Sequence, residues 1–407
     1  MPVLRNIGML AACRAEGGQA DVHPIPRAAL VWIDDTVRWL GPERDLPTRH
    51  ASLESIDAGG RLVVPGLVDC HTHLAFGGWR ADEFEQRVLG RSYEAIAAAG
   101  GGIQSTVRAT RASTQETLVA RAMQFLEAMA ALGITTVECK SGYGLSVDDE
   151  VALLRVYRAA AHQSLVALSP TLLAAHALPP EYADRRGEYI DLVTEELIPT
   201  VAQARLAESC DVFVERGAFT IAEGRRILDA GRLAGMAARV HADQLSPMGG
   251  AELAADVGAW SADHLEHITD RGIRALAAAH VVAVSLPIAT LYLGQPPLPA
   301  RALIDAGVHV AVATDFNPGS APSYHLPLAM LLACTLQHMS PAEALKGATI
   351  YAAQALGRAN RIGSLEPGKE ATFAVMDADD VTQWIYHFRP NACVTTVIGG
   401  QVAWRAP

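Results

Sequence analysis

Residues 62–73 read LVVPGLVDCHTH, an apolar run that ends in an aspartate and two histidines. A run this continuously apolar predicts a strand buried on both faces, as in a parallel sheet covered by helices. Seven further apolar runs follow, near residues 134–140, 165–176, 210–215, 236–242, 260–265, 281–286 and 309–315. Alanine-rich helical segments separate them. This alternation predicts an α/β fold, either a (β/α)8 TIM barrel of roughly 300 residues or a doubly wound open sheet, and a count of eight favours the barrel.

The two ends of the chain have a different pattern. Residues 28–40 contain two short strands around a turn, and residues 371–378 and 393–404 predict a strand and a hairpin. We therefore expect a small β-sandwich domain built from both chain ends. The predicted boundaries are residues 1–63 and 366–407 for the sandwich and residues 64–365 for the barrel.

Composition and charge restrict the class of protein. Of 407 residues, 50% are hydrophobic and 19% are charged, which excludes a disordered chain and suffices for a large core. The net charge is −11 and no basic tract is present, so neither nucleic acid nor an anionic membrane surface is an expected partner. Six cysteines are scattered without a CxxC pair, which is typical of free thiols in a reducing compartment. We expect a cytoplasmic location.

Two apolar segments resemble targeting or membrane signals. Residues 10–13 (LAAC) follow Arg5 like a lipoprotein cleavage site, but the apolar part is short, so a plain N-terminal strand is the better interpretation. Residues 275–300 carry no formal charge, yet they contain a histidine and four prolines. This predicts a helix end, a buried strand and a proline-rich loop rather than a membrane span.

Polar side chains stand at the ends of several predicted strands. His71 and His73 are two apart at the end of the first strand and therefore share one face. His241 ends the fifth run, His264 the sixth and Asp315 the eighth. Because barrel enzymes keep their sites at the C-terminal ends of the strands, we expect all five side chains at one mouth of the barrel.

Histidine and aspartate together are ligands for a divalent metal. Any one of these residues alone could be a core histidine or a helix cap, but four polar strand ends at one mouth indicate a metal centre. Neutral imidazoles and a carboxylate with an open coordination position lower the pKa of bound water to about 7. Hydrolysis is therefore predicted rather than redox chemistry, and no nucleotide-binding or serine-esterase motif competes with it.

Six motifs carry a resemblance to a known family. They are VPGLVDCHTHLAFGGWRADEF (64–84), GGGIQSTVRATR (100–111), ECKSGYGL (138–145), HADQLSPMGGAELAA (241–255), SADHLEH (261–267) and ATDFNPGSAP (313–322). The chain resembles the amidohydrolase superfamily and, within it, the imidazolonepropionase family. The resemblance implies hydrolysis of the cyclic amide of 4-imidazolone-5-propanoate to N-formimidoyl-L-glutamate in histidine degradation, by attack of metal-bound hydroxide on the ring carbonyl. It also implies one divalent metal, zinc or iron.

The resemblance assigns roles to individual residues. The implied metal ligands are His71, His73, His241 and Asp315. The implied catalytic residues are His264 and Asp315. The implied contacts to substrate or product are Arg80, Tyr143, His176, Gln244, Asn317, Gly319 and Ser320. Arg80 is expected to hold the propanoate, because a guanidinium fork matches a carboxylate.

One position departs from the pattern of many mononuclear relatives. Gln244 stands three residues after His241, where those relatives carry a glutamate that transfers protons. An amide cannot exchange a proton usefully at neutral pH, so we interpret Gln244 as a contact to the imidazolone ring. Lys140 and Glu215 leave open a second metal, held by a bridging carboxylated lysine or glutamate.

Two other functions remain open at this stage. A deaminase of a nucleobase-like ring would share the fold and the metal, although Gln244 and Arg80 argue against it. A catalytically inactive scaffold would share the fold, although such proteins usually lose metal ligands and this chain has the whole set. The expected partner is a small-molecule substrate, and a homodimer is the expected assembly.

Overall fold

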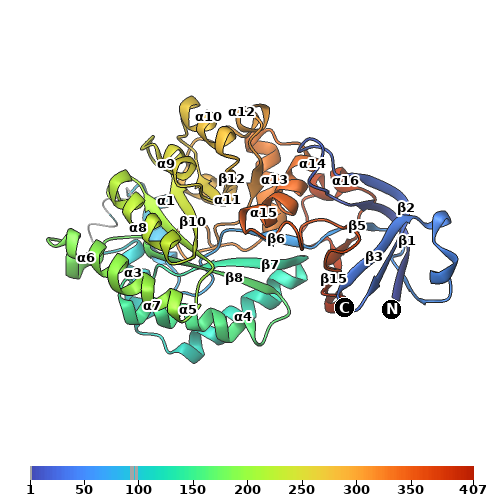
Figure 1. The fold of residues 1–407 in the computed structure, drawn as a ribbon, viewed down its shortest axis with the longest axis horizontal. Coiled ribbons are helices and arrows are strands. Elements are labelled where there is room, and N and C mark those ends of the chain that lie inside the picture. Colours follow the sequence, from blue (N-terminus) through green and yellow to red (C-terminus); the bar gives the residue numbers. More distant parts are fainter. Residues whose placement is uncertain (1, 92–95, 97–99) are drawn as a thin grey trace.

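The computed structural model describes residues 2–91, 96 and 100–407. Figure 1 shows two units side by side: a barrel of strands surrounded by helices, and a separate sheet beside which both chain ends lie. The barrel contains eight parallel strands in the order β13-β12-β11-β10-β9-β8-β7-β6. They are β6 (Leu67–Asp69), β7 (Ile134–Lys140), β8 (Ala167–Ala175), β9 (Ser209–Val214), β10 (Ala237–Ala242), β11 (Ser261–His264), β12 (Val282–Ser285) and β13 (Val310–Val312). These strands match the eight predicted runs, and the fold class is confirmed.

The seam between the first and last strands closes just beyond their ends. His73 N donates to Phe316 O at 2.8 Å, and Asp315 N donates to His71 O at 3.0 Å. Lower in the same seam, the Gln19 side chain donates to Val310 O at 2.7 Å and accepts from Val310 N at 3.0 Å. The hydrogen bonds that close the barrel mouth therefore join two segments that carry predicted metal ligands.

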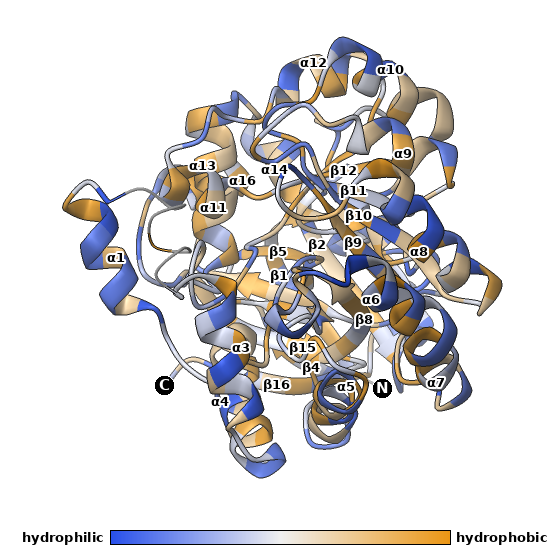
Figure 2. Cartoon of the chain, turned by 90° about the vertical axis from the view of Figure 1, so that its left-hand side faces the viewer, coloured by the Kyte–Doolittle hydropathy of each residue, from blue (hydrophilic) through white to orange (hydrophobic). Residues whose placement is uncertain are grey.

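Most of the helices cover the outside of the barrel, whereas α1 projects from it (Figure 2) and α16 lies on the side of the small sheet (Figure 1). The α-helices of the described residues are α1 (Ala81–Val88), α3 (Ile103–Arg111), α4 (Gln115–Ala131), α5 (Val147–Ala161), α6 (Arg186–Leu192), α7 (Ile198–Gln203), α8 (Ile221–Leu233), α9 (Gly250–Asp256), α10 (Asp270–Ala279), α11 (Pro287–Leu293), α12 (Ala300–Asp305), α13 (Leu326–Gln337), α14 (Pro341–Gly347), α15 (Ile350–Ala355) and α16 (Val381–Tyr386). Hydroxyl side chains cap several of them; Thr220 and Ser340, for example, each form a capping box with a glutamate three residues on. Local sequence therefore determines where these helices begin.

The small sheet combines both chain ends, in the order β16-β15-β14-β5-β1-β2-β3, with β4 paired to β1. Its strands are β1 (Pro2–Ala11), β2 (Pro24–Ile33), β3 (Thr36–Pro42), β4 (Glu54–Asp57), β5 (Leu62–Pro65), β14 (Phe373–Met376), β15 (Cys393–Ile398) and β16 (Gln401–Arg405). The N-terminal segment thus forms a strand, as predicted. Among the described residues, none of the helices has the length and apolarity needed to cross a membrane.

The opening run of residues 62–73 forms two strands, where the sequence predicted one. β5 pairs with β1 and β14 in the small sheet, whereas β6 pairs with β7 in the barrel. The break falls at Pro65 and Gly66, because proline has no N–H for the ladder and a Cβ on Gly66 would collide with the Thr135 side chain. The domain boundaries themselves stay predictions.

Candidate functional site

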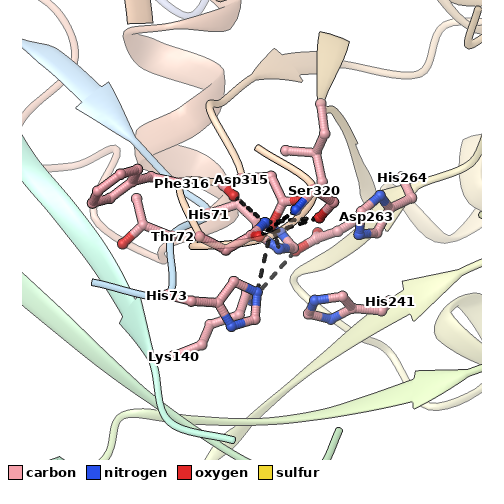
Figure 3. Close-up of polar contacts among 12 residues, drawn as sticks. His71, Thr72, His73, Lys140, His241, Asp263, His264, Asp315, Phe316 and Ser320 are labelled. Carbon is pink, nitrogen blue, oxygen red and sulfur yellow. Dashed lines mark hydrogen bonds and ion pairs between the residues drawn. The ribbon is translucent and has the colours of Figure 1, made fainter. Parts of the chain in front are cut away.

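The five polar side chains from these four strand ends meet at the barrel mouth (Figure 3). His71 Nε2 lies 3.4 Å from Asp315 Oδ1, and His73 Nε2 lies 3.5 Å from the same oxygen. The His71 and His241 rings are 4.5 Å apart, and the His241 and His264 rings are 5.2 Å apart. All five side chains are buried. The structure therefore brings together the residues that the sequence selected.

Three of these imidazoles, those of His71, His73 and His264, have lowered pKa values and are therefore neutral and suited to bind a cation. Burial, followed by the Lys140 charge, lowers the pKa of His71 to about 3. Burial and then His241 hold the pKa of His73 and His264 well below the ordinary value. Among the described residues, His71 Nε2 and both ring nitrogens of His241 have no hydrogen-bond partner, although both rings are buried.

The described residues include two overlapping triads of candidate metal ligands, and within each triad all ligand atoms lie within 4.8 Å of one another. One triad is His71, His73 and Asp315, and the other is His71, His241 and His264. Neutral nitrogens with free lone pairs beside a carboxylate match the donor set of zinc or iron. The residues therefore fit a divalent metal. His264 is predicted to be catalytic, and the structure also makes it one member of the second triad.

Two buried aspartates orient the histidines. Asp263 Oδ2 lies 2.7 Å from His71 Nδ1, and Asp211 Oδ2 lies 2.9 Å from His241 Nδ1. In His71, where Nδ1–H donates to Asp263, the lone pair resides on Nε2. Asp211 stands beside His241 as a charged neighbour. Sequence analysis missed both aspartates; the signal was a lone carboxylate inside an apolar strand, CDVFVE for Asp211 and WSADHL for Asp263.

A buried network of charges lies beneath these aspartates. Lys140 Nζ is 2.7 Å from Asp211 and 2.8 Å from Glu138, and Arg239 is 3.1 Å from Asp263. Burial alone would lower the pKa of Lys140, but Asp211 and Glu138 outweigh it and raise that pKa. An amine held as ammonium is not available for carboxylation, which argues against Lys140 as a bridge between two metals.

Glu215, the other residue considered for a second metal, supports a loop. Its carboxylate accepts hydrogen bonds from Leu245 N at 2.8 Å and Ser246 N at 3.2 Å, and from the Ser246 hydroxyl. Asp243 accepts three further backbone hydrogen bonds, from residues 249–251 at the N-terminal end of α9. Gln244 is thus carried at the mouth on a backbone segment fixed at two points, and its side chain is largely buried.

Arg80 lies at the same mouth, as the residue preceding α1. Its guanidinium is buried and packs against Gly319, where even a Cβ would collide with it. Glu83 is 3.9 Å away, and Arg80 Nε has no hydrogen-bond partner among the described residues. A buried guanidinium with a free N–H is a suitable partner for a substrate carboxylate.

The loop after Asp315 is organised by Asn317. Its Oδ1 accepts hydrogen bonds from Gly319 N and Ser320 N, both at 2.8 Å. Its Nδ2 donates to Asp315 O at 2.7 Å. Asn317 therefore shapes the loop that joins the metal-ligand candidate Asp315 to the surroundings of Arg80.

Tyr143 and His176 form an aromatic wall beside His73. The rings of His73 and His176 stack with centroids 5.0 Å apart, and Tyr143 lies 5.4 Å from His176. Glu150 holds this wall, because its carboxylate accepts from Gly144 N at 2.7 Å and Leu145 N at 2.8 Å. Both aromatic residues are buried at the mouth, as expected for side chains that contact a flat ring.

Comparison with known proteins gives the class first. A model of the amidohydrolase family matches residues 62–403, so fold and site define an amidohydrolase, a class of metal-dependent hydrolases. The chain is 46% identical to the imidazolonepropionase of Geobacillus kaustophilus over 91% of its own length and 89% of that protein. It is also 46% identical to the imidazolonepropionase of Cupriavidus necator, over 93% and 91%. The chain belongs to the imidazolonepropionase family of amidohydrolases.

Solved structures share the fold at low identity. Guanine deaminase of E. coli superposes with a TM-score of 0.74 at 16% identity, over 100% of this chain and 99% of that one. Atrazine chlorohydrolase TrzN of Arthrobacter aurescens, in a variant complexed with zinc and atraton, gives 0.71 at 19%, over 99% and 95%. These similarities confirm the amidohydrolase architecture.

Proposed function

We propose that this enzyme hydrolyses the cyclic amide of 4-imidazolone-5-propanoate to N-formimidoyl-L-glutamate, a step of histidine degradation. The observation that carries the proposal is the buried Arg80 guanidinium at the mouth that holds the histidine cluster, whose Nε–H has no partner among the described residues. Its acidic neighbour Glu83 lies 3.9 Å away, beyond hydrogen-bond distance, so this N–H is available to a substrate carboxylate. Family membership points to the same substrate.

His71, His73, His241 and Asp315 would hold one divalent metal, zinc or iron. When bound, the metal lowers the pKa of its water to about 7 and polarises a carbonyl. The involvement of Lys140 and Glu215 in other contacts supports a single metal rather than two.

The protein side chains would position the substrate and move one proton. Arg80 binds the propanoate with two parallel hydrogen bonds, while Tyr143 and His176 contact one face of the ring and Gln244 its polar edge. Asn317, Gly319 and Ser320 form the loop that meets the glutamate part of the product.

Asp315 and His264 would assist the making and breaking of bonds in the substrate. The water oxygen bonds to the ring carbonyl carbon, and the bond from that carbon to the ring nitrogen breaks. Asp315 takes the proton from the water and passes it to the leaving nitrogen. His264 donates a hydrogen bond to the carbonyl oxygen as negative charge develops there.

The test is an anaerobic assay with freshly generated imidazolonepropanoate. Loss of its ultraviolet absorbance and appearance of formimidoylglutamate are followed for the wild type, His71→Ala and Arg80→Ala. We expect metal-dependent turnover that falls in both variants, with a raised KM in Arg80→Ala. A folded, metal-loaded wild type without turnover would contradict the substrate assignment.

We further propose a homodimer that acts in the cytoplasm on this small molecule. Homodimers are the commonest assemblies of soluble enzymes, and most of the cysteines are buried and all are free. Light scattering on the purified protein gives the mass of the assembly. A monomer at micromolar concentration would contradict the dimer.

A further inference from the structure

Helix α1 carries Arg80 at its N-terminal end but buries almost nothing of its own. All eight residues of α1 are described, and of these only Glu83 is buried. Figure 2 shows the helix projecting from the barrel. Since a helix in a folded protein is stabilised mostly by packing an apolar face, the position of α1 depends on a few individual contacts.

Two side chains attach the far end of α1 to the barrel. Arg87 Nη2 donates to Gly319 O at 3.1 Å, and the Arg87 guanidinium lies over the ring of Tyr292 on α11, 4.8 Å from its centre. Phe84 stacks on the same ring, with centroids 5.4 Å apart and planes inclined by 28°. Because residues three apart share one face of a helix, Phe84 and Arg87 reach Tyr292 together.

Gly319 connects this attachment to Arg80. Its N–H donates to Asn317 Oδ1 at 2.8 Å, and its carbonyl accepts from Arg87. A Cβ on Gly319 would lie 1.4 Å from Arg80 Nη2, so the Arg80 guanidinium lies directly against this residue. Arg80 and Arg87 are about two turns apart along the chain of α1, and both contact Gly319. A shift of α1 or of Gly319 therefore moves the Arg80 guanidinium.

We propose that Arg87 is a positioning residue for the carboxylate site: by bonding to Gly319 O and lying on the Tyr292 ring, it holds the Arg80 guanidinium toward the substrate propanoate. The assignment rests on the proposed function, in which Arg80 binds that propanoate. Arginine is always a cation and has only N–H donors, so its role in these contacts is unambiguous. Its edge can donate to a carbonyl while its flat face lies on an aromatic ring.

The test uses imidazolepropanoate, a stable ring carboxylate that lacks the reacting carbonyl, and the corresponding uncharged propanamide. Calorimetry gives the affinity of the zinc-loaded enzyme for each compound. We expect Arg87→Met to weaken imidazolepropanoate about tenfold, or about 1.4 kcal/mol, and to leave the propanamide unchanged. In turnover of imidazolonepropanoate, KM should rise by a similar ratio while kcat is retained, because uniform binding is lost. Arg87→Lys keeps the charge and a donor and should restore most of the affinity.

Two controls separate position from charge. Arg91 is exposed and donates to Gln86 Oε1 at 2.6 Å, so Arg91→Met removes the same charge from the same segment without touching Gly319 or Tyr292. We expect Arg91→Met to bind imidazolepropanoate like the wild type. In an Arg80→Ala background, Arg87→Met should cause no further loss, since the two residues act through one contact.

Several results would overturn the proposal. They are an unchanged affinity in Arg87→Met, an equal loss in Arg91→Met, an equal loss for the propanamide, or a full additional loss in the Arg80→Ala background. If Arg87→Met fails to fold, Tyr292→Leu decides: removing the ring beside Arg87 should give the same selective loss, and normal affinity there refutes the proposal. A wild type that binds zinc but neither prefers the acid over the amide nor turns over imidazolonepropanoate would instead reject the proposed function.

Discussion

Replacement of Asp263 by asparagine should weaken metal binding while leaving the fold intact. In the structure Asp263 Oδ2 is 2.7 Å from His71 Nδ1, 3.1 Å from Arg239 and 3.5 Å from Lys140. Asparagine has the same shape but no charge, and its amide group would place N–H donors against two cations. The His71 imidazole therefore loses the anion that fixes its tautomer and raises its basicity.

The expected loss follows from this contact. Removing the carboxylate partner of a metal-binding histidine lowers metal affinity about 10- to 100-fold, or about 1.4–2.8 kcal/mol. The assay titrates the apoenzyme with zinc in competition with a chromophoric chelator. Circular dichroism of the apoenzyme gives the fold separately.

Glu150→Gln is the matched control. Glu150 is also fully buried at the mouth, but its carboxylate bonds to the backbone of the Tyr143 loop rather than to a histidine. If Asp263→Asn binds zinc as tightly as the wild type and the control, the contact to His71 does not tune the ligand and the reasoning fails.

Three further outcomes are expected. Gly319→Ala should raise KM for imidazolonepropanoate at least tenfold with zinc affinity unchanged, because its Cβ displaces the Arg80 guanidinium; an unchanged KM would remove Arg80 from the substrate site. Glu150→Gln should raise KM about tenfold, because an amide N–H would oppose the loop amides that position Tyr143. Steady-state kinetics measure this, and a fall in kcat with unchanged KM would contradict it. The folded-state pKa of Glu266 is raised to about 8, so its contribution to stability is full below about 4.5 and is lost as pH rises to 8. Denaturant midpoints of the wild-type and Glu266→Gln apoenzymes are compared from pH 5 to 9. The stability of the wild type relative to Glu266→Gln should fall as pH rises to about 8. A relative stability that does not change with pH would argue against the raised pKa.

Much of the fold could be predicted, because the pattern is local. Continuous apolar runs report strands buried on both faces, and capping residues such as Thr220 and Ser340 mark helix starts. The split of residues 62–73 between two sheets could not be predicted. It depends on partners distant in sequence, because Gly66 N donates to Thr372 O and Leu67 N donates to Gly133 O.

Some residues of the candidate site could likewise be predicted from the sequence, and others could not. His71, His73, His241 and Asp315 could be selected because the ends of parallel strands share one mouth. Asp211 and Asp263 could not, since a lone carboxylate in or after a strand may equally be a cap or an ion-pair partner.

By itself, the sequence determined the eightfold alternation of strands and helices, the five polar side chains at the strand ends and the family motifs. Only the tertiary structure decided which nitrogen of the His71 imidazole faces the mouth. That choice rests on contacts such as His71 to Asp263, 192 residues apart in the chain. Burial, which also comes from the tertiary structure, removes water from His71, His73 and Glu266 and so shifts their pKa values. Neither contact nor burial can be inferred from a residue's neighbours in sequence.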